Sequence, residues 1–149
     1  MTADPTADPT AVRVERDIAA PPEAVFDAWV DPESLGVWMA PDPMTVGAAE
    51  CDPRVGGAFR IVMIGEVGAV EHTGVYEELD RPRRLAFTWR APHLGEVTTR
   101  VRVELTAIPR GTRMVIEHTG LPDAPSRQGH EHGWTSIAAK LAAALAGPG

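Results

Sequence analysis

The chain has 149 residues, a length that fits one domain with a buried core. Apolar residues make up 44% of it and charged residues 23%, which is ordinary for a soluble globular protein. The formal net charge of -7 argues against a partner such as nucleic acid or an anionic membrane surface, because both attract basic patches.

The first ten residues repeat the tetrad Thr-Ala-Asp-Pro and offer almost nothing to bury. We therefore expect residues 1–10 to be a disordered tail and residues 11–149 to form a single domain. The chain begins without the basic and apolar segments of a secretory signal, and no apolar run approaches the roughly 20 residues that span a bilayer. Cys51 is the only cysteine, which excludes an internal disulfide. These features predict a cytoplasmic protein.

The first predicted strand is 12–18, VRVERDI, in which apolar and charged residues alternate. Arg16 puts a charge on the apolar face, and we expect its side chain to reach solvent or a carboxylate. Pro21-Pro22 ends the strand and can begin a short helix, since proline is tolerated in the first helical turn. A second short helix, 33–38, is predicted after a proline break.

Six more strands are predicted, joined by short turns rich in glycine and proline. Apolar residues alternate along them, most regularly between Val97 and Thr106. Strands joined by such short turns are antiparallel neighbours in a sheet. The predicted ranges are 45–50, 59–63, 72–79, 85–89, 97–106 and 112–118.

The last predicted element is a helix over 128–145, ended by Gly147-Pro148-Gly149. His130 lies on its apolar stripe one turn before Trp134, whereas His132 projects from another side. Only this helix is long enough to cover the apolar face of the sheet. The sequence therefore predicts an α+β fold, in which a curved antiparallel sheet of about seven strands holds the C-terminal helix and a cavity remains between them. The apolar stripe consists of Trp134, Ile137, Ala138, Leu141 and Leu145.

Six segments stand out in order along the chain: Arg16, 20–41, 52–63, 72–89, 116–123 and 130–134. Together they resemble the SRPBCC superfamily, and most closely its branch of homologues of the activator of heat-shock-protein-90 ATPase. The resemblance implies the helix-grip, or START-like, fold and a space between sheet and helix that holds an apolar or amphipathic small molecule. Family members often have paired tryptophans where this chain has Trp38-Met39. The eukaryotic activators add an N-terminal chaperone-binding domain that this chain lacks, so chaperone stimulation is not expected.

The expected cavity is lined by inward-facing side chains of the strands and the last helix. Arg54 precedes a double glycine. It either guards the pocket mouth and holds a carboxylate or, as we favour, pairs with Asp52 or Glu50 to fix a bulge. The predicted lining residues are Trp38, Phe59, Ile61, Met63, Tyr76, Phe87, Trp89, Val101, Val103, Met114, Ile116, His118, His130, Trp134, Ile137 and Leu141.

His118 and His130 are the only candidates for chemistry, since both are predicted to face the interior. Such a pair can bind a polar ligand group or pass a proton. The favoured alternative is a buried histidine that is satisfied by the backbone, Tyr76 or Glu117 and ties the helix to the sheet. No metal is expected, because His130 and His132 project from different sides of the helix.

Three functional hypotheses follow. The first, which we favour, is a binding protein for an apolar or aromatic small molecule. The second is a cyclase-like or dehydratase-like enzyme that uses His118 or His130 as acid or base. The third is a protein-interaction module, with a chaperone or a second copy of the chain as partner. The sequence has no phosphate loop, nucleotide fingerprint or nucleophile elbow, which favours binding over catalysis. No cofactor is expected.

Overall fold

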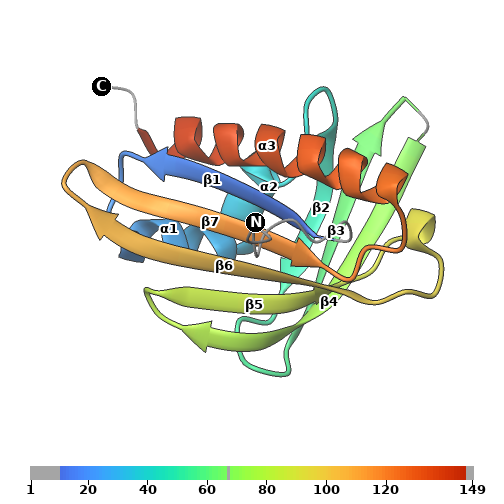
Figure 1. The fold of residues 1–149 in the computed structure, drawn as a ribbon, viewed down its shortest axis with the longest axis horizontal. Coiled ribbons are helices and arrows are strands. Elements are labelled where there is room, and N and C mark those ends of the chain that lie inside the picture. Colours follow the sequence, from blue (N-terminus) through green and yellow to red (C-terminus); the bar gives the residue numbers. More distant parts are fainter. Residues whose placement is uncertain (1–10, 67, 147–149) are drawn as a thin grey trace, which may run out of the picture.

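The computed structural model describes residues 11–66 and 68–146. The predicted tail, 1–10, and the predicted helix stop, 147–149, lie outside the described residues. The elements follow the predicted order (Figure 1). They are β1 (Val12–Ile18), α1 (Pro22–Trp29), α2 (Pro32–Trp38), β2 (Thr45–Cys51), β3 (Ala58–Gly65), β4 (Gly68–Asp80), β5 (Arg84–Trp89), the 3-10 helix η1 (Pro92–Leu94), β6 (Thr99–Ile108), β7 (Gly111–Thr119) and α3 (Ala124–Ala146).

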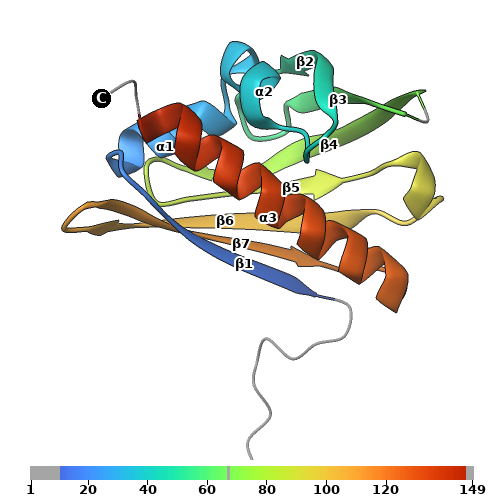
Figure 2. The ribbon, with the colours of Figure 1, turned by 90° about the horizontal axis from the view of Figure 1, so that it is seen from above.

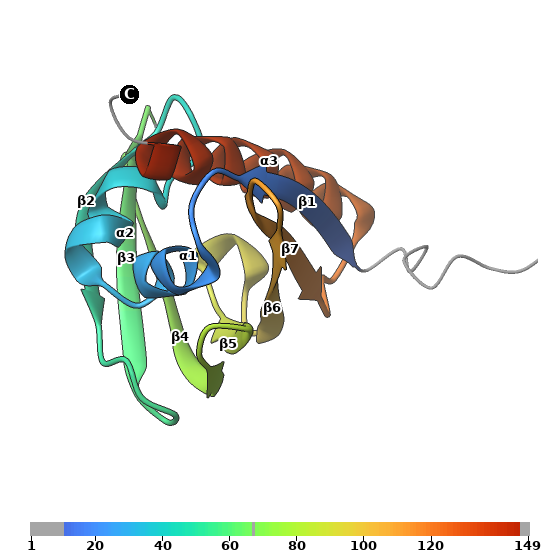
Figure 3. The ribbon, with the colours of Figure 1, turned by 90° about the vertical axis from the view of Figure 1, so that its left-hand side faces the viewer.

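The seven strands form one antiparallel sheet in the order β1-β7-β6-β5-β4-β3-β2. Seen from one end, the sheet curls from β1 on one side to β2 on the other, and α3 closes the open top (Figure 3). From above, α3 runs obliquely across the sheet, with α2 beside it (Figure 2). The predicted α+β helix-grip fold is confirmed.

The two short helices are defined by prolines and by one cap. Pro22 and Pro32 lie in the first turns of α1 and α2, where a missing backbone N–H leaves no hydrogen bond unmade. Asp31 caps α2 by accepting a hydrogen bond from the backbone N–H of Glu33 at 3.3 Å. Both helices face inward through tryptophans, and the rings of Trp29 and Trp38 meet edge to face at 4.7 Å between centroids.

Three elements begin two or more residues away from their predicted starts. β4 begins at Gly68, not at residue 72, so its hairpin with β3 extends further. β6 begins at Thr99, not at Val97, because η1 and the turn at Gly95 occupy the preceding residues. α3 begins at Ala124, not at residue 128. The side chain of Asp123 accepts a hydrogen bond from the backbone N–H of Ser126 at 2.8 Å, and this contact stabilises an additional turn that has no large apolar side chain.

The core lies between the concave face of the sheet and the three helices. From α3 it receives Trp134, Ile137, Ala138 and Leu141, all four from the predicted apolar stripe. Arg16, the charge on the apolar face of β1, is exposed, as expected.

Candidate functional site

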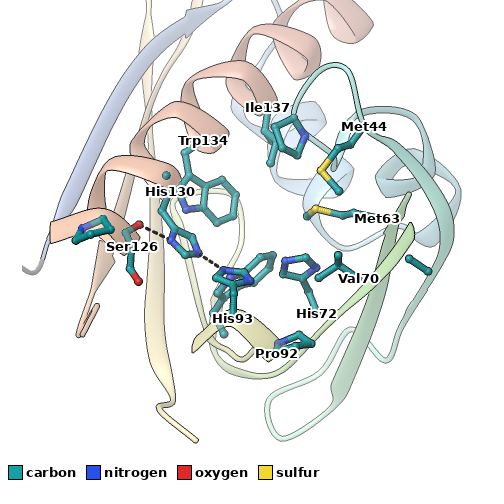
Figure 4. A pocket seen from close by; sticks show the side chains of 16 residues that line it. Met44, Met63, Val70, His72, Pro92, His93, Ser126, His130, Trp134 and Ile137 are labelled. Carbon is teal, nitrogen blue, oxygen red and sulfur yellow. Dashed lines mark hydrogen bonds between the residues drawn. The ribbon is translucent and has the colours of Figure 1, made fainter. Parts of the chain in front are cut away.

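A pocket of about 690 Å³ lies under the N-terminal half of α3, between that helix, η1, the β3–β4 hairpin and the loop that follows α2 (Figure 4). It reaches the surface at His93, which is exposed. Most of its wall is apolar, and the polar groups of its side chains are three imidazoles, one hydroxyl and the indole N–H groups of Trp89 and Trp134. The lining residues are Pro41, Met44, Met63, Ala69, Val70, His72, Trp89, Pro92, His93, Pro125, Ser126, Gly129, His130, Gly133, Trp134 and Ile137.

The loop that carries Pro41 and Met44 is fastened to α3 by three polar contacts. Lys140 donates to the backbone carbonyl of Ala40 at 2.7 Å, and its Nζ lies 3.4 Å from a carboxylate oxygen of Asp42. The backbone N–H of Asp42 donates to the hydroxyl of Ser136 at 2.8 Å. This loop has no periodic pattern, so its place in the pocket wall was missed by sequence reasoning.

Two glycines of α3, Gly129 and Gly133, line the pocket four residues apart, on one face of the helix. A Cβ at Gly129 would meet nothing within 4 Å, and one at Gly133 would meet only Pro41, at 3.9 Å. A helical glycine costs about 1 kcal/mol relative to alanine. The chain thus keeps two glycines where side chains would fit, and side chains there would occupy the pocket.

We expect Gly129→Ala to raise the free energy of unfolding by about 0.5–1 kcal/mol, because the position is helical and open. Urea denaturation followed by tryptophan fluorescence measures the change. Gly36→Ala is a matched control, since Gly36 is an exposed glycine of α2 that also has open space. A destabilised Gly129→Ala variant would show that packing requires the glycine.

His130 is anchored to its own helix and faces a second histidine. Its Nδ1–H donates to the backbone carbonyl of Ser126 at 2.7 Å, which leaves Nε2 as an acceptor. The Nε2 of His93, on η1, lies 3.4 Å from this acceptor and carries the shared proton (Figure 4). Burial lowers the pKa of both imidazoles, so both are uncharged at neutral pH.

His118 on β7 is fully buried, and both of its ring nitrogens are hydrogen-bonded. The indole N–H of Trp134 donates to its Nδ1 at 3.0 Å, and its Nε2–H donates to the hydroxyl of Thr99 at 2.6 Å. That hydroxyl in turn donates to the carbonyl of Trp89 at 3.0 Å. Burial, reinforced by His130 and His93, lowers the pKa of His118 to about 2. His118 thus ties α3 to the sheet through Thr99 and Trp134, not through Tyr76 or Glu117.

His72 and His93 were not among the residues selected from the sequence. His72 is buried against Trp89, with 4.9 Å between ring centroids, and its Nδ1 has no hydrogen-bond partner. Burial lowers its pKa to about 4. Its sequence signal was the alternation of β4, since His72 shares the inward face with Tyr76. His93 lies in a short turn with no such signal.

Five of the predicted lining residues line the pocket: Met63, Trp89, His130, Trp134 and Ile137. Four others, with Trp89, border a separate internal gap of about 10 Å³, which has room for about one water molecule. Trp38 packs in the core and donates to the hydroxyl of Ser34 at 3.1 Å. The four at the gap are Phe59, Ile61, Tyr76 and Phe87. The other predicted lining residues are buried in the core, as Trp38 is: Val101, Val103, Met114, Ile116, His118 and Leu141.

Arg54 does not line the pocket. It projects from the turn between β2 and β3, and its Nε donates to the carboxylate of Asp52 at 2.7 Å. This ion pair with Asp52 is the alternative that the sequence favoured for Arg54, instead of a place at the pocket mouth. Within 11–66 and 68–146, no three His, Cys, Asp or Glu side chains are arranged to share a metal ion. None of the helices in these ranges is long and apolar enough to cross a membrane.

Comparison with known proteins assigns the chain to a family. The model of the family described as "Activator of Hsp90 ATPase homolog 1-like protein" matches residues 19–146. A crystal structure of a Chromobacterium violaceum protein is 28% identical, with a TM-score of 0.84 over 91% of this chain and 97% of that one. The AHSA1 protein from Silicibacter pomeroyi is 29% identical, with a TM-score of 0.77 over the same shares of the two chains.

A crystal structure of a Nitrosomonas europaea protein is 25% identical, with a TM-score of 0.77 over 93% of this chain and 95% of that one. No curated protein matches the chain. The family match covers nearly all of the described fold, and the order of elements is that of the helix grip. The chain therefore belongs to the family of activator of Hsp90 ATPase homolog 1-like proteins, within the SRPBCC superfamily, as the six sequence segments predicted.

Proposed function

We propose that this protein binds an apolar or aromatic small molecule in the pocket under the N-terminal half of α3. The observation that carries the proposal is the pair of glycines at 129 and 133, which line the pocket and leave open space where side chains would fit. The pocket volume of about 690 Å³ falls within the usual range of ligand sites, about 300–1,000 Å³. Met44, Met63 and Ile137 supply adaptable apolar contacts.

The hydrogen bonds of His118 support binding over catalysis. Because both of its nitrogens are occupied within the core, His118 offers a ligand neither a proton nor a lone pair. His130 shares one proton with His93 and lies at the pocket. The proposal includes a cytoplasmic location, which the single cysteine supports. It includes neither a chaperone nor a second copy of the chain as partner.

The proposal predicts saturable binding of a neutral apolar fluorophore. We expect N-phenyl-naphthylamine to bind with a micromolar Kd, with enhanced emission and quenching of tryptophan, because Trp89 and Trp134 line the pocket. Gly133→Leu is expected to weaken binding at least about tenfold, since its side chain fills the space. Fluorescence titration measures both.

Ala143→Leu is the matched control, because it adds the same side chain at an exposed position of the same helix. It should bind the fluorophore as the wild type does. Urea denaturation establishes that both variants are folded. The absence of saturation in the wild type, or unchanged binding by a folded Gly133→Leu variant, would contradict the proposal.

A further inference from the structure

The polar groups of the pocket are gathered at one end and come from three separate elements. His72 extends from β4, His93 from η1 and His130 from α3 (Figure 4). The ring centroids are 5.2 Å apart for His93 and His130 and 5.9 Å apart for His72 and His93. Met44 and Ile137 lie on the opposite side of the pocket (Figure 4), and Met63 lies between them and His72, on the strand paired with β4. The pocket therefore has an apolar side and an imidazole side.

The hydrogen-bond pattern leaves the histidine pair one nitrogen for a ligand. The Nδ1–H of His130 is used on the carbonyl of Ser126, and its Nε2 accepts from the Nε2–H of His93. A neutral imidazole has one N–H group, and in His93 it is at Nε2. The Nδ1 of His93 therefore has a free lone pair and can accept a hydrogen bond. No other described residue hydrogen-bonds to it. A proton added there leaves the bond to His130 intact and turns Nδ1 into a cationic donor.

His72 supplies the second polar contact. Its side chain is 95% buried, since its exposed fraction is 5%, and its Nδ1 has no hydrogen-bond partner. A buried polar atom without a partner destabilises a protein by about 1–3 kcal/mol. That atom is closed to the pocket, so a ligand oxygen at this end would meet His72 through its other ring nitrogen, Nε2. With its hydrogen on Nε2, a neutral His72 is a donor for such an oxygen.

Resting on the function proposed above, we infer that the ligand is an amphipathic carboxylic acid, whose apolar body lies against Met44, Met63 and Ile137 and whose carboxylate meets His72 and His93. One proton is bound with the carboxylate and forms the imidazolium of His93. The complex then holds one negative and one positive charge in contact, which is the arrangement that an apolar site tolerates. A charge-assisted hydrogen bond joins the two.

The proton has to arrive with the ligand because no other charge at the site balances the carboxylate. Among the described lining residues there is no Asp, Glu, Lys or Arg. His118, which packs behind His130 at 4.7 Å between centroids, is held neutral by its two hydrogen bonds. On α3, Arg127 donates to the carbonyl of Ala11, its Nη2 lies 3.9 Å from Glu131, and neither side chain lines the pocket.

The sign of the pH dependence follows from this balance. In the free protein, burial lowers the pKa of His72, His93 and His130, so the pocket is uncharged at neutral pH. A bound carboxylate raises the pKa of the imidazole that it contacts. Binding therefore takes up a proton, and affinity for the carboxylate falls as the pH rises. A neutral ligand of the same shape takes up none.

Decanoic acid and decanol form a matched pair for the test, and each displaces N-phenyl-naphthylamine in a competition titration. From about pH 6.5 to about pH 8, decanoic acid is ionised throughout, and its affinity is expected to fall by up to about tenfold per pH unit. The affinities of decanol and of the fluorophore are expected to stay within about twofold. Calorimetry in two buffers of different ionisation enthalpy should report uptake of about one proton with the acid.

Two variants locate the effect. His93→Leu is expected to weaken decanoic acid about tenfold or more at the lower pH and to remove the pH dependence, so that the ratio of its affinity to that of decanol no longer changes with pH. His132→Leu is the control, since His132 is exposed on the same helix as His130 and does not line the pocket. It should leave both affinities unchanged.

The outcomes separate this inference from the proposed function. Fluorophore and decanol binding without a pH-dependent preference for the acid, or an unchanged preference in His93→Leu, would overturn the acid assignment and leave the pocket's function standing. Failure of all three compounds to bind would overturn both. Loss of decanoic acid binding on addition of EDTA would show that the carboxylate is held through a metal ion, which also overturns the direct contact.

Discussion

Replacement of Trp134 by alanine is expected to lower the free energy of unfolding by about 3–5 kcal/mol, the range for a large aromatic side chain in a core. Trp134 is 2% exposed, and its side chain packs from α3 into the core against the sheet. Its ring lies 5.3 Å from that of Trp89 and 6.1 Å from that of Trp29, between centroids. Urea denaturation followed by circular dichroism measures the loss.

Trp134→Phe separates the ring from its hydrogen bond. Phenylalanine keeps most of the apolar contact but removes the indole N–H, so the Nδ1 of His118 loses its donor inside the core. Leaving that acceptor unsatisfied is expected to cost about 1–3 kcal/mol. If Trp134→Ala unfolded at nearly the same urea concentration as the wild type, with the same m value, α3 would not be seated on the sheet through this residue.

Mild acid is expected to destabilise the protein by roughly 4 kcal/mol between about pH 6.5 and about pH 4.5, before most carboxylates titrate. Two buried histidines cause this. Burial lowers the pKa of His118 from 6.5 to about 2 and that of His72 from 6.5 to about 4. Well above pH 6.5 both imidazoles are neutral in the folded and the unfolded chain, and they then cost the protein no stability.

Below that pH, His72 and His118 bind protons in the unfolded chain but not in the folded protein, so stability falls by about 1.4 kcal/mol per pH unit for each of these two histidines. Urea denaturation over a pH series measures the slope. In His72→Leu the dependence should roughly halve, and stability at neutral pH should be equal or higher, because the unpartnered Nδ1 is gone. A wild type whose stability is flat over this range would show that both imidazoles are protonated in place.

Periodic segments of the sequence determined their own elements well. The alternation in VRVERDI predicted β1 with its observed ends, and the stripe from Trp134 to Leu141 predicted the buried face of α3. Alternation reports which side chains share a face, and a curled sheet buries one face. The first turn of α3 was missed because the Asp123 side chain, not an apolar residue, stabilises it.

The position of the pocket could not be predicted in the same way. Periodicity places Val101, Val103, Met114 and Ile116 on the inner face of the sheet, but they pack tightly in the core. The pocket lies where side chains are missing, at Gly129 and Gly133, and where a non-periodic loop is fastened to α3 through Lys140. His93 also lies in a segment without periodicity, the short helix η1, so its place at the pocket could not be predicted either.

The pairing of β1 with β7, together with the packing of α3 on β1, brings the two ends of the chain into one unit (Figure 1). During synthesis, the ribosome releases β1 long before its partner strand and its covering helix exist. The concave apolar face therefore stays open to water until nearly the whole chain has emerged, and folding depends on contacts between distant parts of the sequence. A nascent chain halted before α3 would expose the inner side of the sheet, and in a living cell it would be a substrate for chaperones and proteases.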